Sequence, residues 1–321
     1  MTASYEIIDY SLRPAKFAER KMLCDFFSRL RVFGSLESYR YVGFGSIWFS
    51  DCVLFHRTLG ISDIVSIECE LDHQERFEFN NPLRGIRLLM GEASDVLPTL
   101  DWSLRSIVWL DYDDPLNVSI LEDVRTVASR AKSGTAFVVS VQAEKIFDKR
   151  NDDDHIHVQS RDEFSDYFGE GRTPEALRQA DLRGWTLSKT SRQIVRAEIE
   201  EGLKAANAAR PNGQKIEFRQ TVAFEYKDGA KMTTIGGVFV DQGQAALFDG
   251  AGLRELEFFR DSDEALRIHM PLVTPHEMRH LDRQLPILEE VGLDAEPIPV
   301  REANRYAKFY RYLPNFASFE R

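Results

Sequence analysis

The segment SYRYVGFGSIWFSDCVLFHRTLG, residues 38–60, joins two apolar runs through a pair of glycines. Residues 38–44 form a short, nearly continuous apolar run, which is typical of a buried strand. The longer run that follows has the length of a helix, and Gly60 provides its stop signal. The sequence therefore predicts a strand, a tight glycine turn and a helix, which together make the first unit of a parallel α/β sheet.

Four further strand-like runs follow at residues 62–68, 85–93, 105–112 and 134–143. They are continuously apolar, as expected of parallel strands that are buried on both faces. Between the last two runs, Ser119 and Glu122 predict a capping box at a helix start, and Gly134 predicts the helix stop. The pattern predicts a five-stranded parallel sheet with helices on both faces.

The remaining sequence is predicted to extend this sheet and to cover it. Residues 145–215 are polar and are predicted to form a helical insertion, with a second helix start at Thr173-Pro174-Glu175. Asp228-Gly229 separates two apolar runs and is a strong β-hairpin signal, which brings the expected number of strands to seven. The chain is thereby divided into an N-terminal helical segment, a main domain and a C-terminal extension, at residues 1–37, 38–241 and 242–321.

Composition narrows the class of protein. The chain has 321 residues, 43% of them hydrophobic, and no apolar run long enough for a membrane span, so we expect a folded cytoplasmic protein. Cys24, Cys52 and Cys69 are odd in number and lack CxxC spacing, which predicts reduced, buried thiols. The net charge of -11 disfavours a broad nucleic-acid-binding face, although residues 11–40 are locally basic.

The glycine turn after the first strand is a candidate nucleotide site. Backbone N–H groups and the positive end of a helix are free at such a turn. Glu68 ends the second predicted strand 23 residues after Gly45, close to the spacing of an acidic residue that accepts ribose hydroxyls. Trp48 replaces the third glycine of the dinucleotide fingerprint, and the chain has no GxxxxGK[ST] loop, so both of those nucleotide sites are disfavoured.

These features resemble the class I S-adenosylmethionine-dependent methyltransferases over about residues 38–241. The resemblance implies a Rossmann-like α/β fold whose sheet has seven strands, with parallel strands followed by an antiparallel hairpin, a helical insertion and a C-terminal tail. The residues that it assigns to S-adenosylmethionine are Gly43, Phe44, Gly45 and Ser46 for the methionine part, Glu68 for the ribose, and Glu92, Ala93 and Ser94 for the adenine.

Three carboxylates, Asp111, Asp113 and Asp114, cluster at the end of the fourth predicted strand. The Asp-x-Asp run resembles the strand end of metal-dependent O-methyltransferases, where the first acid binds magnesium or calcium. Asp114-Pro115-Leu116 resembles an altered Asp-Pro-Pro-Tyr motif of amino-methyltransferases. At this position the carboxylates could hold a divalent ion such as Mg²⁺ or act as a base. The alternative is a turn in which Asp114 caps the next helix and the others are solvated.

The basic stretch RPAKFAERK, residues 13–21, precedes the first strand. One hypothesis is that it folds over the cofactor pocket and offers Arg13 or Lys16 to a ligand carboxylate or phosphate. A surface helix with salt pairs is the alternative. Lys16 is therefore grouped with the three aspartates as a candidate catalytic residue, and no residue is assigned to a metal.

Three other patterns have structural explanations. Residues 276–280 read HExxH, the zinc-protease signature, but Thr274 and Glu277 also form a capping box. The acidic, histidine-containing run at 152–157 is typical of a solvated loop. The aromatic cluster within 306–316 suits core packing better than the stacking of bases.

The sequence thus predicts a methyltransferase that uses S-adenosylmethionine, of the O-methyltransferase branch, with a small-molecule acceptor and no membrane partner. Two alternatives stay open. The first is a catalytically degenerate relative that senses a nucleotide or serves as a scaffold, since Tyr41 opens the glycine motif where an acid is usual. The second is a nucleic-acid methyltransferase. The sequence identifies neither the acceptor nor the oligomeric state.

Overall fold

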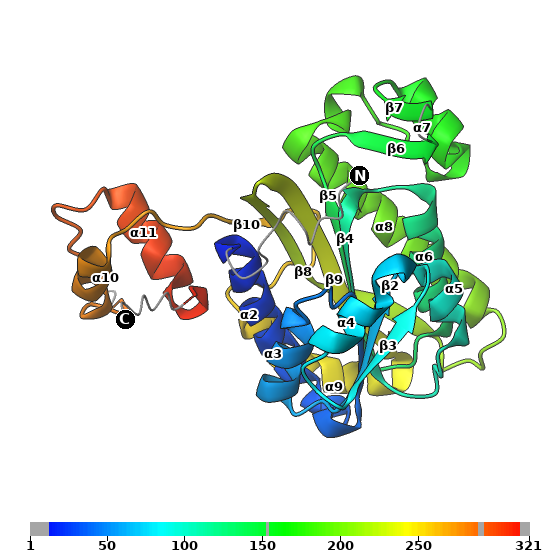
Figure 1. Cartoon of the computed structure of the whole chain (residues 1–321), viewed down its shortest axis with the longest axis horizontal. Helices are drawn as coiled ribbons and strands as arrows, with labels where there is room; N and C mark the ends of the chain where they lie inside the picture. The colour runs from blue at the N-terminus through cyan, green and yellow to red at the C-terminus, as the bar shows by residue number, and fades with distance from the viewer. Residues whose placement is uncertain (1–12, 152–153, 288–291, 315–321) are drawn as a thin grey trace.

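The computed structural model describes residues 13–151, 154–287 and 292–314 (Figure 1). Its core is a sheet of eight strands in the order β10-β8-β9-β5-β4-β1-β2-β3. The strands are β1 (Arg40–Gly43), β2 (Asp63–Glu68), β3 (Ile86–Met90), β4 (Ser106–Pro115), β5 (Ala136–Gln142), β8 (Ile216–Asp228), β9 (Ala230–Asp241) and β10 (Leu266–Ile268).

The strand directions confirm the predicted fold class. Strands β3, β2, β1, β4 and β5 are parallel, and β9 is antiparallel to both of its neighbours, β5 and β8. Strands β8 and β9 form the hairpin expected at Asp228-Gly229. The eighth strand, β10, pairs in parallel with β8 and was not predicted. It belongs to the C-terminal segment and adds an edge strand to the sheet beside the hairpin.

Helices cover both faces of the sheet, as buried parallel strands require. One apolar cluster joins Tyr41, Ile107 and Trp109 to helices α2 and α3. A second cluster, on the other face, joins Val42 and Val108 to α6 and α8. The helices are α2 (Pro14–Ser28), α3 (Ser50–Leu59), α4 (Gln74–Asn80), α5 (Ala93–Val96), α6 (Val118–Arg130), α7 (Arg161–Phe168), α8 (Gly184–Asn207), α9 (Ala245–Asp249), α10 (Pro275–Asp282) and α11 (Val300–Phe309).

Three local predictions about helix ends differ in outcome. Gly60 ends α3 in the left-handed conformation, with φ 77°, as predicted. The capping box at Ser119 is wrong, because Asn117 caps α6 and its side chain accepts the Ile120 amide at 2.9 Å. Gly134 has φ 88° but lies in the turn beyond the end of α6, which stops at Arg130.

The insertion at residues 145–215 contains the predicted helices α7 and α8, but it begins with a small two-stranded sheet. Its strands are β6 (Ile146–Asn151) and β7 (Asp154–Val158), which pair antiparallel. The helix start predicted at Thr173 is wrong, because the Thr173 hydroxyl donates to the Gly169 carbonyl at 3.0 Å. That hydroxyl closes a turn of the α7–α8 connection, and α8 begins only at Gly184.

The prediction of buried thiols holds for two cysteines only. Cys24 and Cys52 are buried and Cys69 is exposed, because it lies just beyond the end of β2, and all three are free. Among the described residues, no helix is long and apolar enough to cross a bilayer.

We predict that Gly237→Ala destabilises the fold at the middle of the hairpin. A Cβ at Gly237 would collide with the Arg219 carbonyl and would approach the Gln220 Cα to 2.8 Å. Both are backbone atoms held in the β8–β9 ladder, so overpacking should cost about 1–3 kcal/mol of unfolding free energy in urea. Gly171→Ala is the matched control, since nothing lies within 4 Å of its Cβ. Equal stability of the two variants would contradict the packing described here.

Candidate functional site

The carboxyl ends of β1, β2 and β4 meet at one edge of the sheet, where open α/β sheets place their ligands. Gly43 at the end of β1 is in register with Ser66 of β2 and Trp109 of β4. The glycine turn that follows is packed against protein on its inner side. A Cβ at Gly45 would lie 2.5 Å from Ser66 Oγ and 2.8 Å from Phe49 Cδ1, so only glycine fits.

The turn has a strained backbone and buried polar groups. Ser46 and Phe49 adopt positive φ angles of 51° and 47°, which non-glycine residues rarely do. The Gly45 amide donates to Ser66 Oγ at 3.0 Å. Within the described residues, the buried hydroxyls of Ser46 and Tyr41 find no hydrogen-bond partner. Strain and unsatisfied polar groups of this kind cluster at ligand sites.

Glu68 closes the turn from the side of β2. The Ser66 hydroxyl donates to Glu68 Oε1 at 3.0 Å. Burial raises the pKa of Glu68 to about 7, although hydrogen bonds from Ser66 and from the Ser46 and Gly45 amides counter that shift. The structure therefore brings Glu68 together with the predicted glycine turn, as a half-buried carboxylate beside backbone donors.

The rim of β3 completes this side of the edge. The Gly91 amide donates to the Glu68 carbonyl at 2.9 Å, which joins the ends of β2 and β3. Glu92 and Ser94 are exposed and Ala93 is buried at the start of α5. Phe44 packs edge-on against Tyr112 of β4, with ring centroids 5.0 Å apart.

Lys16 of α2 reaches Asp111, which lies in β4 two residues beyond Trp109, the last residue of that strand paired with β1. The Lys16 ammonium lies 2.6 Å from Asp111 Oδ1, 2.8 Å from Glu19 Oε2 and 3.1 Å from the Tyr226 hydroxyl. It also lies 4.2 Å from the centre of the Trp109 ring. Lys16 is only 1% exposed, and these three bonds use all three of its hydrogens. In this arrangement its ammonium has no hydrogen left for a ligand.

The protonation states of this pair follow from burial and charge. Burial lowers the pKa of Lys16, but the carboxylates of Asp111 and Glu19 outweigh it, and the pKa lies above its usual value. Burial raises the pKa of Asp111 to about 6, against the pull of Lys16. Near neutral pH, Lys16 is therefore an ammonium and Asp111 is mostly a carboxylate.

A buried polar network continues from Lys16 into the sheet. Glu19 accepts a hydrogen bond from the Thr234 hydroxyl, which shares a 2.8 Å hydrogen bond with Ser140. The indole of Trp109 donates to the Ser140 hydroxyl at 3.0 Å. Sequence reasoning missed these groups. Lys16 and Glu19 stand three residues apart on one helix face, which is the signal that could have linked them.

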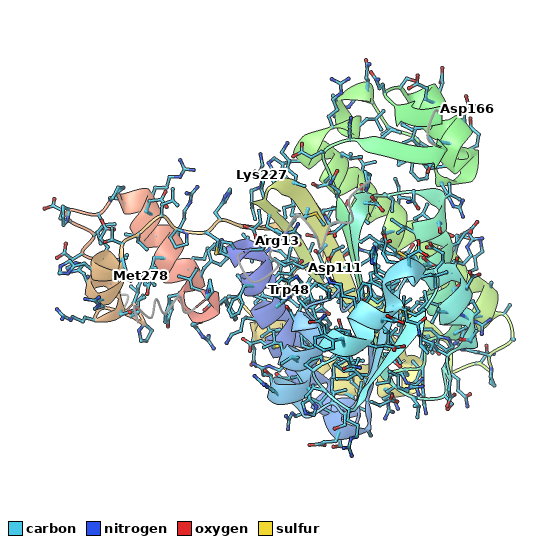
Figure 2. The ribbon with its side chains drawn as sticks, viewed as in Figure 1. Arg13, Trp48, Asp111, Asp166, Lys227 and Met278 are labelled. Carbon is cyan, nitrogen blue, oxygen red and sulfur yellow. The ribbon has the colours of Figure 1, made fainter. Side chains whose placement is uncertain are left out.

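The other two predicted aspartates lie nearer the solvent. Asp113 is 3.8 Å from a guanidinium nitrogen of Arg13, at the start of α2, and Figure 2 labels Arg13 and Asp111 on their two elements. Asp114 is exposed and does not cap α6, because Asn117 does so. In the described part of the chain, no group of three or more His, Cys, Asp or Glu residues could hold a metal ion.

The rival motifs have structural roles where they are described. Thr274 and Glu277 form the predicted capping box of α10, with the Glu277 carboxylate accepting the Thr274 amide at 2.6 Å. His280 Nε2 lies 3.1 Å from the Asp294 carbonyl. Tyr306, Phe309 and Tyr312 are buried. Asp152 and Asp153 of the acidic loop and Phe316 lie outside the described residues.

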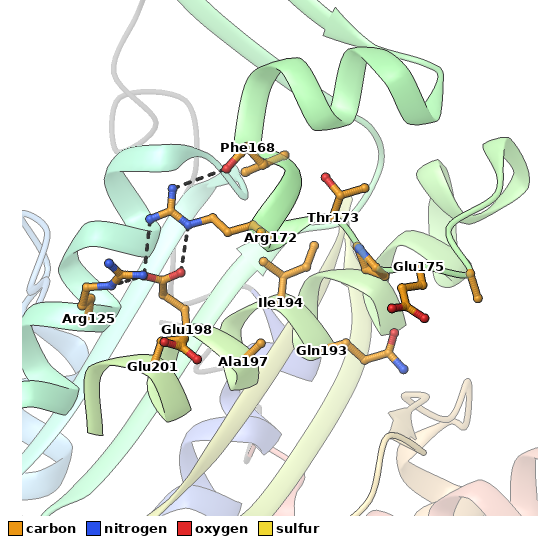
Figure 3. A pocket seen from close by; sticks show the side chains of 13 residues that line it. Arg125, Phe168, Arg172, Thr173, Glu175, Gln193, Ile194, Ala197, Glu198 and Glu201 are labelled. Carbon is orange, nitrogen blue, oxygen red and sulfur yellow. Dashed lines mark hydrogen bonds and ion pairs between the residues drawn. The ribbon is translucent and has the colours of Figure 1, made fainter. Parts of the chain in front are cut away.

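A separate cavity of about 970 Å³ lies between the α7–α8 connection, α8 and Arg125 of α6 (Figure 3). Its polar wall is the buried Glu198, which pairs with Arg172 at 2.9 Å and with Arg125 at 2.5 Å. None of the residues predicted to bind the cofactor lines it.

Comparison with known proteins identifies the family. A family model described as "Putative O-methyltransferase" matches residues 8–321. The chain belongs to this O-methyltransferase family. Membership confirms the predicted enzyme class, and the sheet order confirms the methyltransferase-like fold. No curated protein matches the chain.

Solved structures resemble this O-methyltransferase family member only distantly. Cofactor-bound Rv0187 from MTB is 18% identical, with a TM-score of 0.33 over 68% of this chain and 78% of that one. An O-methyltransferase family protein from Burkholderia thailandensis is 12% identical, with a TM-score of 0.33 over 69% and 56%. The complex of LepI with SAM is 10% identical, with a TM-score of 0.32, and the chain spans 43% of its length against 63% of its own.

We predict that Lys16→Met destabilises the O-methyltransferase strongly. The substitution keeps most of the side-chain volume but leaves Asp111 and Glu19 buried without their cation, which should cost about 3–5 kcal/mol of unfolding free energy. Lys21→Met on the same helix is the control, and it should cost less than about 1 kcal/mol. Chemical denaturation measures both variants. Equal losses would show that the buried ion pair does not hold α2 in place.

Proposed function

We propose that the enzyme transfers the methyl group of S-adenosylmethionine to the oxygen of a small-molecule acceptor at the carboxyl ends of β1, β2 and β4. The observation that carries this assignment is the position of Asp111. Its carboxylate lies on β4 just beyond the part of that strand paired with β1, the strand that leads into the glycine turn, and is held by a buried ammonium. Membership of an O-methyltransferase family supports the choice of oxygen as the acceptor atom.

The residues of the turn fit the proposed cofactor. A ribose offers two hydroxyl donors, and Glu68 is a half-buried carboxylate at the adjoining strand end. The Ser46 hydroxyl is buried and lacks a partner within the described residues, so it can serve a ligand. Glu68 would hold the ribose, the turn would hold the methionine part, and Glu92 with Ala93 and Ser94 would meet the adenine. When bound, the cofactor supplies a methyl group on a sulfonium sulfur.

Asp111 is the proposed general base. Its Oδ1 atom is bound to Lys16, and no hydrogen bond to Oδ2 is found among the described residues. Its pKa of about 6 leaves it ionised at neutral pH and close enough to neutrality for proton transfer. The acceptor hydroxyl would give its proton to Asp111 while its oxygen bonds to the methyl carbon and the carbon–sulfur bond breaks. Lys16 positions the carboxylate and does not exchange protons.

We favour this base over a role in binding Mg²⁺. Two of the three candidate ligands already face a cation, since Asp111 pairs with Lys16 and Asp113 lies near Arg13. The side chain of Asp111 is only 16% exposed, which also favours a small acceptor over a large one. Activity that survives complete chelation by EDTA supports the metal-independent assignment, and activity that is restored only by Mg²⁺ contradicts it.

We predict that cofactor binding weakens as the pH falls, through Glu68. The ribose hydroxyls donate to the carboxylate, so protonation of Glu68 below its pKa of about 7 opposes binding. S-adenosylhomocysteine should bind about tenfold more weakly at pH 6 than at pH 8 in calorimetric titration. Glu68→Gln should bind weakly at both pH values. A steep pH dependence that persists in Glu68→Gln would assign the titration to another group.

We predict that Asp111→Asn lowers the rate of methyl transfer without loss of the cofactor. Removal of a general base should reduce kcat about 100-fold or more, measured as S-adenosylhomocysteine release with a panel of phenols and alcohols. The affinity for S-adenosylhomocysteine should stay within about threefold, because Asp111 is assigned to the acceptor. Asp114→Asn, at an exposed position, is the matched control and should keep near-normal activity. Equal activity of both variants would exclude Asp111 as the base.

A further inference from the structure

A strip of positive charge runs along the hairpin edge of the sheet. Lys227 of β8 lies directly opposite Lys231 of β9 in the hairpin ladder. Strand β10 pairs in parallel with β8 up to Ile268 and Tyr226, so the next residues, His269 and Lys227, lie side by side. Figure 2 labels Lys227 at the hairpin tip. Neighbouring strands are about 4.8 Å apart, so three strands present basic side chains at one level.

Arg267 belongs to the same face of the sheet, because residues two apart on a strand point the same way. Its guanidinium lies 4.5 Å from the centre of the Trp185 ring at the start of α8. Lys231 lies 5.7 Å from that ring. Trp185 therefore makes cation–π contacts with both Arg267 and Lys231 and holds the two cations close together.

Helix α11 extends the strip. Arg301, Arg305 and Lys308 have the i, i+4, i+7 spacing of a single helix face. All three act on His269, as does Arg267. Burial and these four cations together hold the pKa of His269 below its usual value. The Leu272 amide, three residues after His269, donates to Glu302 of α11 at 2.9 Å, so α11 lies beside the chain that follows β10.

The carboxylates near the strip neutralise it only in part. Glu144 pairs with Lys231 at 3.1 Å. Glu302 pairs with Arg305 at 2.8 Å and lies 4.0 Å from Arg301. Glu225 faces Arg267 at 2.7 Å but is shared with the buried Arg192 at 3.0 Å. Within the described chain, neither Lys227 nor Lys308 has a carboxylate at ion-pair distance.

Like charges that face each other across strands or along a helix destabilise the fold. The protein carries a net charge of -11, so this concentration of cations does not follow from its composition. A bound anion with several closely spaced charges would relieve the repulsion, and arginine and lysine are the usual ligands of phosphate.

We propose that the strip formed by Lys227, Lys231, Arg267, His269 and the basic face of α11 binds a ligand with several linked phosphate groups. The phosphates of a small molecule and those of a nucleic-acid backbone share this chemistry. None of these residues is assigned to the cofactor or to the acceptor. The strip adjoins the proposed methyl-transfer site, because Tyr226 and Asp228, on either side of Lys227, both bind Lys16.

Calorimetric titration of the full-length protein with tripolyphosphate and with a mixed-sequence 20-nucleotide RNA tests the proposal. At 50 mM KCl we expect binding of at least one probe, weakened about tenfold or more at 200 mM KCl, because charge neutralisation is salt-dependent. Tripolyphosphate binding at least as tight as that of the RNA would indicate a small ligand. RNA binding more than tenfold tighter would indicate a polymer. Failure of both probes to bind would overturn the proposal.

The variants Lys227→Glu and Arg301→Glu should each weaken the binding probe at least fivefold. Both positions are exposed, so the variants should fold, and thermal unfolding checks this. Arg57→Glu and Arg84→Glu are the matched controls, because both are exposed and lie on α3 and before β3, towards the opposite edge of the sheet. They should change the affinity less than twofold. Equal losses in all four variants would show that net charge, and not this strip, attracts the probe.

Discussion

The ion pair between Lys16 and Asp111 is the interaction on which the site depends. An ammonium taken out of water is costly, and the cost is offset here by three hydrogen bonds and an aromatic face. The partners come from α2, β4 and β8, so these elements must be in place together. Helix α2 is thereby fixed at the carboxyl end of β4, although it precedes the sheet in the sequence. The same contact holds one carboxylate oxygen of Asp111 against Lys16, and the proposed base would use the other.

The site combines stable surroundings with unfavourable local features. Several local features each cost folding free energy. They are the left-handed Ser46 and Phe49, the Ser46 hydroxyl, which has no partner among the described residues, and the raised pKa values of Glu68 and Asp111. The packed strands β1, β2 and β4 hold these features in place. A carboxylate whose pKa lies near neutrality is poor for stability but suited to proton transfer or to pH-sensitive binding. The cavity beside Glu198 lacks such a carboxylate, because Glu198 is paired with both Arg125 and Arg172.

Much of the fold could be predicted because each parallel strand is a continuous apolar run, and Asp228-Gly229 marks the hairpin. The edge strand β10 could not, since three residues give too short a pattern. Strand order predicts that the proposed cofactor residues lie together, because strand ends meet at one edge of a parallel sheet. Their assignment to the cofactor rests on the resemblance to methyltransferases. The partners of Lys16 could not be predicted from strand order, because Tyr226 lies 210 residues away and only packing brings the two residues together. The start of α6 was also predicted two residues too late, because Asn117 caps the helix in place of the expected Ser119.

The central claim is that the carboxyl ends of β1, β2 and β4 bind the methyl donor. Hydrogen–deuterium exchange with and without saturating S-adenosylhomocysteine tests it most directly, because it locates the ligand without knowledge of the acceptor. The account predicts protection of the turn at residues 43–49 and of the strand ends near Glu68 and Asp111. Protection confined to the cavity around Glu198, or no protection at any of these segments, would contradict it.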